Sequence, residues 1–256
     1  MKITNIKFNN TVIPFQNSVN TEEIKDRETL NNTLPYFLDK VLIGIMLGDG
    51  NISRSSLTSN SRFEMSFGQK YKEYAESIGN LFIDYVSESS KTMPIKTVEL
   101  KLKDKVYTNY RFKTASLPIF NKYHSLFYKM ETQINLNSKN SVSKKSSLRF
   151  IKIIPSNILE LLDPISLAYL IMSDGNYDKS RNRVRIYTNS YSKEEVDMLS
   201  KALNTKFGIY TAVLHDRKDQ WIITIGATQL DSLRNLVSPY FHHTLLYRIG
   251  ILEEVE

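Results

Sequence analysis

The sequence contains no cysteine in its 256 residues and only four histidines. The absence of cysteine excludes disulfide bonds, thiolate nucleophiles and cysteine-ligated zinc sites. The histidines are scattered and do not show the spacing of a histidine metal site. A metal ion bound by this chain would therefore need oxygen ligands from carboxylates or backbone carbonyl groups.

Long apolar runs are also absent. The two longest, near residues 42–47 and 167–172, fall well short of the roughly 20 residues that a bilayer-spanning helix needs. The amino-terminal region does not show the charged-then-apolar pattern of a signal peptide. We therefore expect a protein without a membrane partner that acts where it is made.

Acidic residues are outnumbered by basic ones, since 27 Asp and Glu face 34 Lys and Arg and leave a net charge of +7. This excess favours a polyanionic partner such as nucleic acid. Glycine and proline are scarce, at 9 and 7 residues, whereas Asn, Ile, Lys, Tyr and Phe are abundant. That bias is expected of an A+T-rich coding sequence and indicates an organelle or phage genome. From it we predict a mitochondrial location.

An apolar segment that ends in Asp-Gly-Asn occurs twice. It reads LIGIMLGDGN at 42–51 and LAYLIMSDGN at 167–176, and the copies align without a gap at an offset of 174 − 49 = 125 residues. Each copy is expected to be a helix, because Pro35 and Pro164 stand where proline favours a helix start. Since such repeats indicate repeated structural units, the chain is predicted to fold as two similar halves.

The segments after the two helices show the same order of elements. A strand with alternating apolar and polar residues precedes a polar helix and two extended segments, whose short turn suits an antiparallel hairpin. The expected ranges are strands 62–67 and 183–188, helices 72–82 and 193–207, and hairpins 96–114 and 209–225. The predicted fold class is α+β, with two pseudo-symmetric halves that each contain a twisted antiparallel sheet.

The rest of the chain lies outside the two repeats. Residues 132–159 are rich in Ser, Asn and Lys and contain no Asp or Glu, which predicts a basic linker between the halves. Residues 1–33 match neither repeat, so they are either an appended arm or an ordered strap. The predicted domains are an N-terminal arm at 1–33, a first half at 34–131, the linker at 132–159 and a second half at 160–256.

Asp49 and Asp174 end the two apolar helices. A carboxylate there faces the negative end of the helix dipole, which costs about 0.3–1 kcal/mol. One Asp-Gly after a helix is usually only a turn, and two ordinary core helices would explain the apolarity but not both acids. If the helices pack side by side, repulsion between the carboxylates favours a divalent cation. Small residues would permit such packing: Gly44, Gly48, Ala168 and Ser173.

Two such motifs, 125 residues apart and each followed by an αββαββα-like pattern, resemble those of the LAGLIDADG homing endonucleases. The resemblance is to the monomeric, intron-encoded type with two motifs, and it spans about residues 35–250. It implies two sheets that form a DNA-binding saddle, with the halves joined at the two packed motif helices. It also implies a site-specific DNA endonuclease that makes a metal-dependent double-strand break in a long, asymmetric DNA target.

The resemblance further implies a metal site. The family's metal-binding acid falls at Asp49 and at Asp174, and the carbonyl oxygens of Gly48 and Ser173 are implied as further ligands. Mg²⁺ is the implied cofactor. Ca²⁺ is expected to substitute for it without supporting cleavage, because its looser coordination positions the attacking water poorly.

Four more residues are placed beside these acids by the resemblance. A basic residue before an Ile-Pro pair corresponds to Lys152, and a basic residue near the carboxyl end corresponds to Arg248. Both would offset charge that develops on the phosphoryl oxygens, although an arginine does not easily act as a base. A polar residue at the end of the second strand, implicated in ordering water, falls at Gln69 and at Ser190.

Alternation along the predicted strands assigns side chains to the two faces of each sheet. Along 97–103 the polar residues, including Lys101 and Lys103, alternate with Val98, Leu100 and Leu102, so we expect the polar set to meet DNA. Lysines of the linker are expected to contact phosphates, which carry affinity but no sequence information. The predicted DNA-binding residues are Arg54, Arg62, Glu64, Lys101, Lys103, Asn109, Arg111, Lys113, Lys139, Lys144, Lys145, Arg181, Arg183, Arg185, Tyr187, Arg217 and Lys218.

The predicted partner is double-stranded DNA, bound by a monomer, with intron RNA as an alternative partner. Two other functions share this fold: a maturase that binds its intron RNA without cutting DNA, and a DNA-binding protein that does not cleave. Loss of an acid from one motif would have favoured either of them. Both acids are present. A DNA cleavage assay is the best test to distinguish an endonuclease from these two alternatives.

Overall fold

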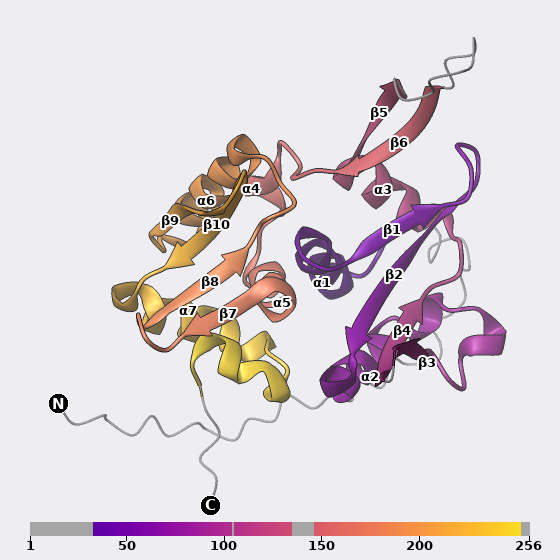
Figure 1. The fold of residues 1–256 in the computed structure, drawn as a ribbon, viewed down its shortest axis with the longest axis horizontal. Helices are drawn as coiled ribbons and strands as arrows, with labels where there is room; N and C mark the ends of the chain where they lie inside the picture. The colour runs from indigo at the N-terminus through magenta and orange to yellow at the C-terminus, as the bar shows by residue number, and fades with distance from the viewer. Residues whose placement is uncertain (1–32, 104, 135–145, 252–256) are drawn as a thin grey trace, which may run out of the picture.

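The structure is a computed structural model that describes residues 33–103, 105–134 and 146–251 (Figure 1). The first half contains α1 (Tyr36–Leu47), β1 (Asn51–Arg54), β2 (Ser61–Gly68), η2 (Gln69–Tyr71), α2 (Lys72–Leu81), η3 (Ile83–Tyr85), η4 (Glu88–Ser90), β3 (Ile95–Leu102), β4 (Lys105–Lys113), η5 (Pro118–Phe120) and α3 (Asn121–Phe127). Three elements connect the halves: β5 (Tyr128–Ile134), β6 (Ser146–Lys152) and α4 (Ile158–Leu161). The second half contains α5 (Pro164–Asp174), β7 (Gly175–Asp178), β8 (Arg183–Tyr187), α6 (Lys193–Phe207), β9 (Thr211–Arg217), β10 (Gln220–Ile225), η6 (Ala227–Gln229), α7 (Leu230–Val237), η7 (Ser238–Tyr240) and η8 (His243–Ile249).

Each half contains one four-stranded antiparallel sheet. The strand orders are β1-β2-β4-β3 and β7-β8-β10-β9, so the two sheets have the same topology. Helix α2 lies against β4 in the first half, and α6 lies against β9 and β10 in the second. The predicted α+β fold with two pseudo-symmetric halves is therefore confirmed. Strands β1 and β7, at four residues each, are too short to show the alternation that identified the others.

Helices α1 and α5 pack side by side at the centre of the molecule (Figure 1). Residues 41–47 of α1 and 165–173 of α5 are all buried, as expected for helices that are apolar on every face. A Cβ atom on Gly44 would lie 2.3 Å from the Ser166 carbonyl oxygen and 2.8 Å from the Tyr169 Cβ atom. The predicted close packing is therefore correct: Gly44 lies against Ser166 and Tyr169, and Gly48 lies against Ser173.

The segment predicted as a linker is in part a β-hairpin. Strand β6 pairs with β5 in antiparallel register, with Tyr128 opposite Lys152. The ring of His124 stacks on Tyr128 at 5.0 Å and meets Phe150 edge-on at 4.6 Å. These contacts hold the base of the hairpin on α3, and they place Lys152 at a fixed position near the end of α1.

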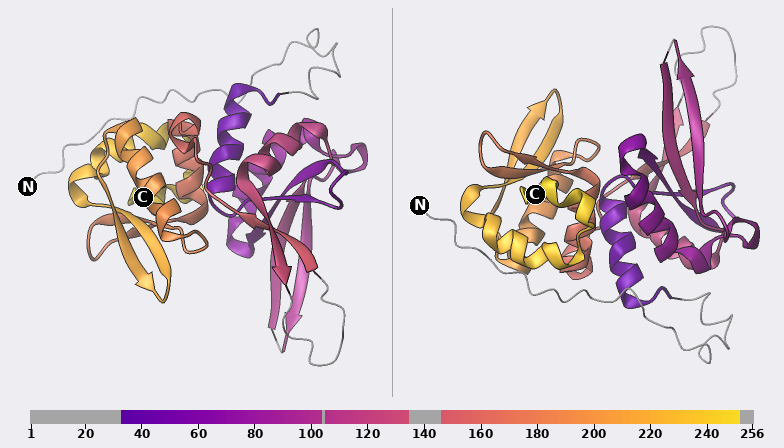
Figure 2. Two further views of the ribbon diagram at one scale, coloured as in Figure 1. Left: turned by 90° about the horizontal axis from the view of Figure 1, so that it is seen from above. Right: turned by 90° about the horizontal axis from the view of Figure 1, so that it is seen from below.

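Both long hairpins, β3–β4 and β9–β10, project from the same side of the molecule, one on each side of α1 and α5 (Figure 2). This arrangement agrees with the predicted saddle, whose two sheets flank the ends of the motif helices. Within the described ranges, no helix combines the length and the apolar character that a membrane span requires.

Candidate active site

Asp49 and Asp174 meet where the two central helices end. Asp49 follows α1 after Gly48, and Asp174 is the last residue of α5. A Cβ atom on Gly48 would lie 3.0 Å from the Oδ2 atom of Asp174. Asp49 is exposed and Asp174 is half-buried. Burial, together with the charge of Asp49, raises the pKa of Asp174 to about 7, so a cation placed between the two acids would relieve their repulsion.

Each helix end is bound by one basic side chain from another element. The Nζ atom of Lys152, at the end of β6, donates to the carbonyl oxygens of Gly48 at 2.5 Å and Gly50 at 2.8 Å. In the second half, the Nη1 atom of Arg248, in η8, donates to the carbonyl oxygens of Ser173 at 2.8 Å and Gly175 at 2.7 Å.

These two arrangements are equivalent. Ser173 follows Gly48 by 125 residues and Gly175 follows Gly50 by 125 residues, which is the offset of the repeat. The two cations satisfy carbonyl groups that a helix end leaves without partners, and they offset the negative end of each helix dipole. Burial lowers the pKa of Lys152 to about 8, although Asp174 and Asp49 act in the opposite direction.

The oxygen atoms at this site suit a hard divalent cation. The carboxylates of Asp49 and Asp174 are close enough to interact, and the carbonyl oxygens of Gly48 and Ser173 lie at the same helix ends. A carbonyl oxygen that accepts one hydrogen bond keeps a second lone pair. The Oγ atom of Ser173 is buried and has no hydrogen-bond partner among the described residues. No cluster of three or more His, Asp or Glu side chains occurs within the described ranges. A site with only two carboxylates, Asp49 and Asp174, is typical of Mg²⁺, which is usually held by one or two carboxylates together with water and substrate phosphate.

A cavity of about 370 Å³ lies beside Asp174. Its walls include three residues that were not predicted to belong to the site, namely Lys70, Tyr71 and Tyr247. Lys70 and Tyr71 directly follow Gln69, and Tyr247 directly precedes Arg248, so proximity to the predicted residues was the available signal. The Nη2 atom of Arg248 donates to the Tyr71 hydroxyl at 2.9 Å.

Gln69 and Ser190 occupy equivalent positions in the two halves. Asn51 pairs with Glu64 in the first sheet and Asn176 pairs with Arg185 in the second, so β2 and β8 are related by 185 − 64 = 121 residues. Adding 121 to 69 gives 190. Both side chains are exposed, where each can approach a bound water or phosphate.

Candidate nucleic-acid surface

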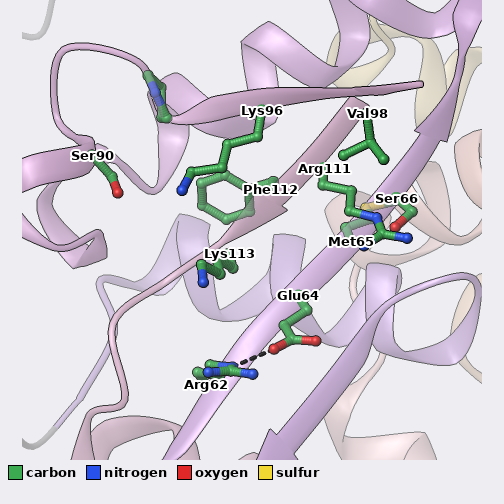
Figure 3. Close-up of a pocket in the computed structure, with 11 residues that line it drawn as sticks. Arg62, Glu64, Met65, Ser66, Ser90, Lys96, Val98, Arg111, Phe112 and Lys113 are labelled. Atoms are coloured by element: carbon green, nitrogen blue, oxygen red, sulfur yellow. Dashed lines mark hydrogen bonds and ion pairs between the residues drawn. The ribbon is translucent and has the colours of Figure 1, made fainter. Parts of the chain in front are cut away.

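The outward face of the first sheet carries a charged cavity of about 360 Å³ (Figure 3). Arg62 forms an ion pair with Glu64, which also accepts a hydrogen bond from the Ser53 hydroxyl at 3.0 Å. The register places Glu64 opposite Lys113 on β4. The lining residues are Arg62, Glu64, Met65, Ser66, Ser90, Pro94, Lys96, Val98, Arg111, Phe112 and Lys113.

The predicted face of β3 is wrong. Lys96 pairs with Arg111 and Val98 pairs with Asn109, so Lys96 and Val98 share the outward face. Lys101 pairs with Val106 and lies on the opposite face from Arg111. Alternation misled here because the far end of the hairpin is not covered by helices, and its apolar residues are not buried. Leu100, for example, is 41% exposed. Lys103 lies in the hairpin turn with a φ of 54°.

The second sheet presents two arginines that are held by one acid. The Arg183 Nε atom donates to Asp178 Oδ2 at 3.1 Å, and the Arg185 Nη2 atom donates to the same oxygen. A hydrogen bond from Ser180 and those from both arginines hold the pKa of Asp178 well below its usual range. Asp178 was missed, because an acid on the short strand β7 gave no sequence signal. Tyr187 is exposed on the same strand as the arginines.

The other predicted DNA-binding residues lie in turns or outside the described residues. Arg54 donates to the carbonyl oxygens of Ser56, Leu57 and Ser59, so its guanidinium group holds the β1–β2 turn. Arg181 is exposed in the β7–β8 turn. Arg217 is the last residue of β9, and Lys218 follows it in the β9–β10 turn. Three linker lysines fall outside the described residues: Lys139, Lys144 and Lys145.

Comparison with known proteins agrees with the family resemblance that the two motifs indicated. Residues 39–233 match the model of the LAGLIDADG DNA endonuclease family. A "probable intron-encoded endonuclease 1" of Wickerhamomyces canadensis is 31% identical over 235 residues, which cover 90% of this chain and 91% of that relative. The solved structure of the homing endonuclease I-WcaI bound to its DNA recognition sequence is 25% identical, with a TM-score of 0.72, and covers 93% of this chain and 95% of that one. Cytochrome b mRNA maturase bI2 of Saccharomyces cerevisiae is 25% identical over 91% of this chain and 52% of that relative.

Proposed function

Because this chain belongs to the LAGLIDADG DNA endonuclease family, we propose that it is a site-specific homing endonuclease that makes a metal-dependent double-strand break in a long, asymmetric DNA target. The observation that carries the proposal is the meeting of Asp49 and Asp174 at the junction of two sheets whose hairpins project from one side. A single chain supplies both halves of this arrangement, so the active form is a monomer.

Asp49 and Asp174, with the carbonyl oxygens of Gly48 and Ser173, would hold the divalent cation, and we propose Mg²⁺ for this role. When bound, such a cation activates a water molecule and stabilises the departing oxygen of a phosphodiester. Lys152 and Arg248 are fixed at the two helix ends, where they stabilise negative charge on the phosphoryl oxygens of the two strands. Arg248 acts as a fixed charge and not as a base. Gln69 and Ser190 orient the attacking water molecules.

The DNA-facing sheets supply the recognition. The longest strands of the two sheets are β4, with nine residues, and β9, with seven. At ~3.3 Å per residue they span about 30 Å and about 23 Å, so at ~3.4 Å per base step the two sheets can read about 16 base pairs. Guanidinium groups on β8 can pair with guanine edges in the major groove. The lysines of the linker, outside the described residues, are proposed to contact phosphates.

The test begins by selecting a target from random DNA duplexes in Ca²⁺, followed by cleavage of the selected duplex in Mg²⁺. Asp49→Asn and Asp174→Asn are expected to abolish cleavage while DNA binding without divalent cation survives, because only the metal site is lost. Asp84→Asn, which changes an exposed acid elsewhere, is the matched control and should cleave normally. Full cleavage in excess EDTA would contradict the proposal.

A maturase role is the second candidate, because one relative named as an mRNA maturase aligns with 91% of this chain. The same relative, the intron-encoded relatives and the A+T-rich composition support encoding in an organelle, and we propose the mitochondrion. Filter binding to the chain's own intron RNA, compared with an unrelated RNA of equal length, tests this role. Equal affinity for both RNAs would argue against it.

A further inference from the structure

The surroundings of the two basic residues differ between the halves. Lys152 donates to two carbonyl oxygens. Arg248 makes the matching pair of bonds and adds a third, from Nη2 to the Tyr71 hydroxyl at 2.9 Å. Tyr71 belongs to η2 of the first half, 177 residues away in the sequence. This hydrogen bond therefore connects the two halves at the wall of the cavity beside Asp174.

Lys70 and Arg248 lie on the ring of Tyr71. The Lys70 Nζ atom is 4.8 Å from the ring centroid, and the guanidinium carbon of Arg248 is 5.4 Å from it, which are favourable cation–π distances. Burial raises the pKa of Tyr71, but hydrogen bonds to Tyr247 and Lys70 and the charge of Arg248 outweigh it, and the pKa is lowered. Two cations and a phenol are thus grouped in one cavity, a set of groups that suits a phosphate.

The equivalent residues of the other half are used differently. With the offset of 121, Lys70 corresponds to Tyr191 and Tyr71 to Ser192. Tyr191 is buried and donates to the carbonyl oxygen of Leu47 at 3.1 Å. Ser192 caps α6 by accepting a hydrogen bond from the Glu195 amide. Both side chains therefore make hydrogen bonds that hold the fold together on that side.

We propose that Lys70 and Tyr71 serve only one of the two strand-cutting centres, the one at Asp174 and Arg248, where Lys70 binds the DNA phosphate and Tyr71 positions Arg248. This inference rests on the proposed endonuclease function. Its consequence is that the two DNA strands are cut with different residues, and a single change on this side affects one strand alone.

The donors of Arg248 explain why it needs a positioning residue. A guanidinium group has five N–H donors, and the two on Nη1 are used by the carbonyls of Ser173 and Gly175. Both of these N–H groups lie in the rigid guanidinium plane and hold the Nη1 end of the group at the helix. The bond to Tyr71 holds the Nη2 end, which faces the cavity, and one N–H of Nη2 remains for a phosphate oxygen. The Nε atom is buried without a partner among the described residues.

The test uses the full chain and a selected target duplex whose two strands carry different end labels. Nicking of each strand is followed in Mg²⁺ with protein in excess. Tyr71→Phe should slow one strand about tenfold, as loss of one charge-assisted hydrogen bond predicts, and leave the other strand unchanged. Arg248→Lys should slow the same strand, and Lys152→Arg should slow the opposite one.

Lys70→Met provides a second measurement that does not depend on the fold, because Lys70 is exposed. It should slow the same strand as Tyr71→Phe, whereas the matched control Lys72→Met, two residues away and also exposed, should slow neither. A role in stability alone would slow both strands together. Equal slowing of the two strands by Tyr71→Phe and Lys70→Met, or no slowing of either, overturns this proposal and leaves the endonuclease proposal standing. Absence of any nicking by the unaltered protein overturns both.

Discussion

At the scale of single residues, function and stability conflict at Asp174. An aspartate has an ordinary pKa near 3.9, and burial beside Asp49 raises the pKa of Asp174 to about 7. Between these values the native chain binds more protons than the unfolded chain does. The free energy of unfolding therefore falls as pH rises from about 4 to about 7 in the absence of a divalent cation. This instability is what a bound cation would offset.

Asp174→Asn is accordingly expected to stabilise the metal-free protein while it abolishes cleavage. The neutral amide removes the charge that burial disfavours, so the gain should be large near pH 8 and small near pH 3, where Asp174 is protonated in both states. Urea unfolding in EDTA at several pH values measures this. The control Asp84→Asn should show no such pH dependence. A gain that is equal at both pH values, or a loss near pH 8, would contradict the argument.

At the scale of elements, the site depends on how closely α1 and α5 approach. Gly44 lies against the backbone of Ser166, and Gly48 lies against the Ser173 side chain. The carboxylates of Asp49 and Asp174 follow directly, so the helix spacing sets the distance between them. Even a methyl group at Gly44 would therefore push these helices apart.

Gly44→Ala is expected to destabilise the protein by about 1–3 kcal/mol, because the added carbon must displace a backbone in a packed interface. Gly226→Ala is the matched control, since nothing lies within 4 Å of a Cβ atom there and its φ of −77° is open to any residue. Denaturant unfolding compares the two variants. If Gly44→Ala is no less stable than Gly226→Ala, the close packing of α1 on α5 is not what holds the halves together.

At the scale of the whole molecule, the two sheets share a topology but not a set of recognition groups. The register makes Arg62 equivalent to Arg183 and Glu64 equivalent to Arg185. A carboxylate accepts a hydrogen bond from cytosine N4, whereas a guanidinium group donates to guanine O6 and N7. We therefore expect the same place in each half to read a different base pair.

The optimal target is thus expected to be non-palindromic, and the cleaving species to be a monomer. Arg185→Ala should relax the preference at one base pair of one half-site, with a loss of about 1–3 kcal/mol there, and leave the other half-site unchanged. A binding scan over single-base variants and sedimentation of the protein–DNA complex check both points. A palindromic optimum, or cleavage only by a dimer, would contradict this view.

The sequence by itself determined the features that depend on short-range spacing. The repeat around Asp49 and Asp174 identified both central helices, because their apolar residues and ends are encoded within about three turns. The start of α5 is also encoded by neighbouring residues, since Pro164 is its first residue and Asp163 caps it. Lys152 and Arg248 follow from the resemblance of short motifs to a family.

Only the tertiary structure decided which residues from distant segments meet. The face of β3 was assigned wrongly because alternation gives the period of a strand, whereas the pairing of Lys96 with Arg111 gives its register. The contact between Tyr71 and Arg248 spans 177 residues, and no local pattern encodes it. Such contacts depend on how the halves pack, because packing alone brings η2 of one half to η8 of the other.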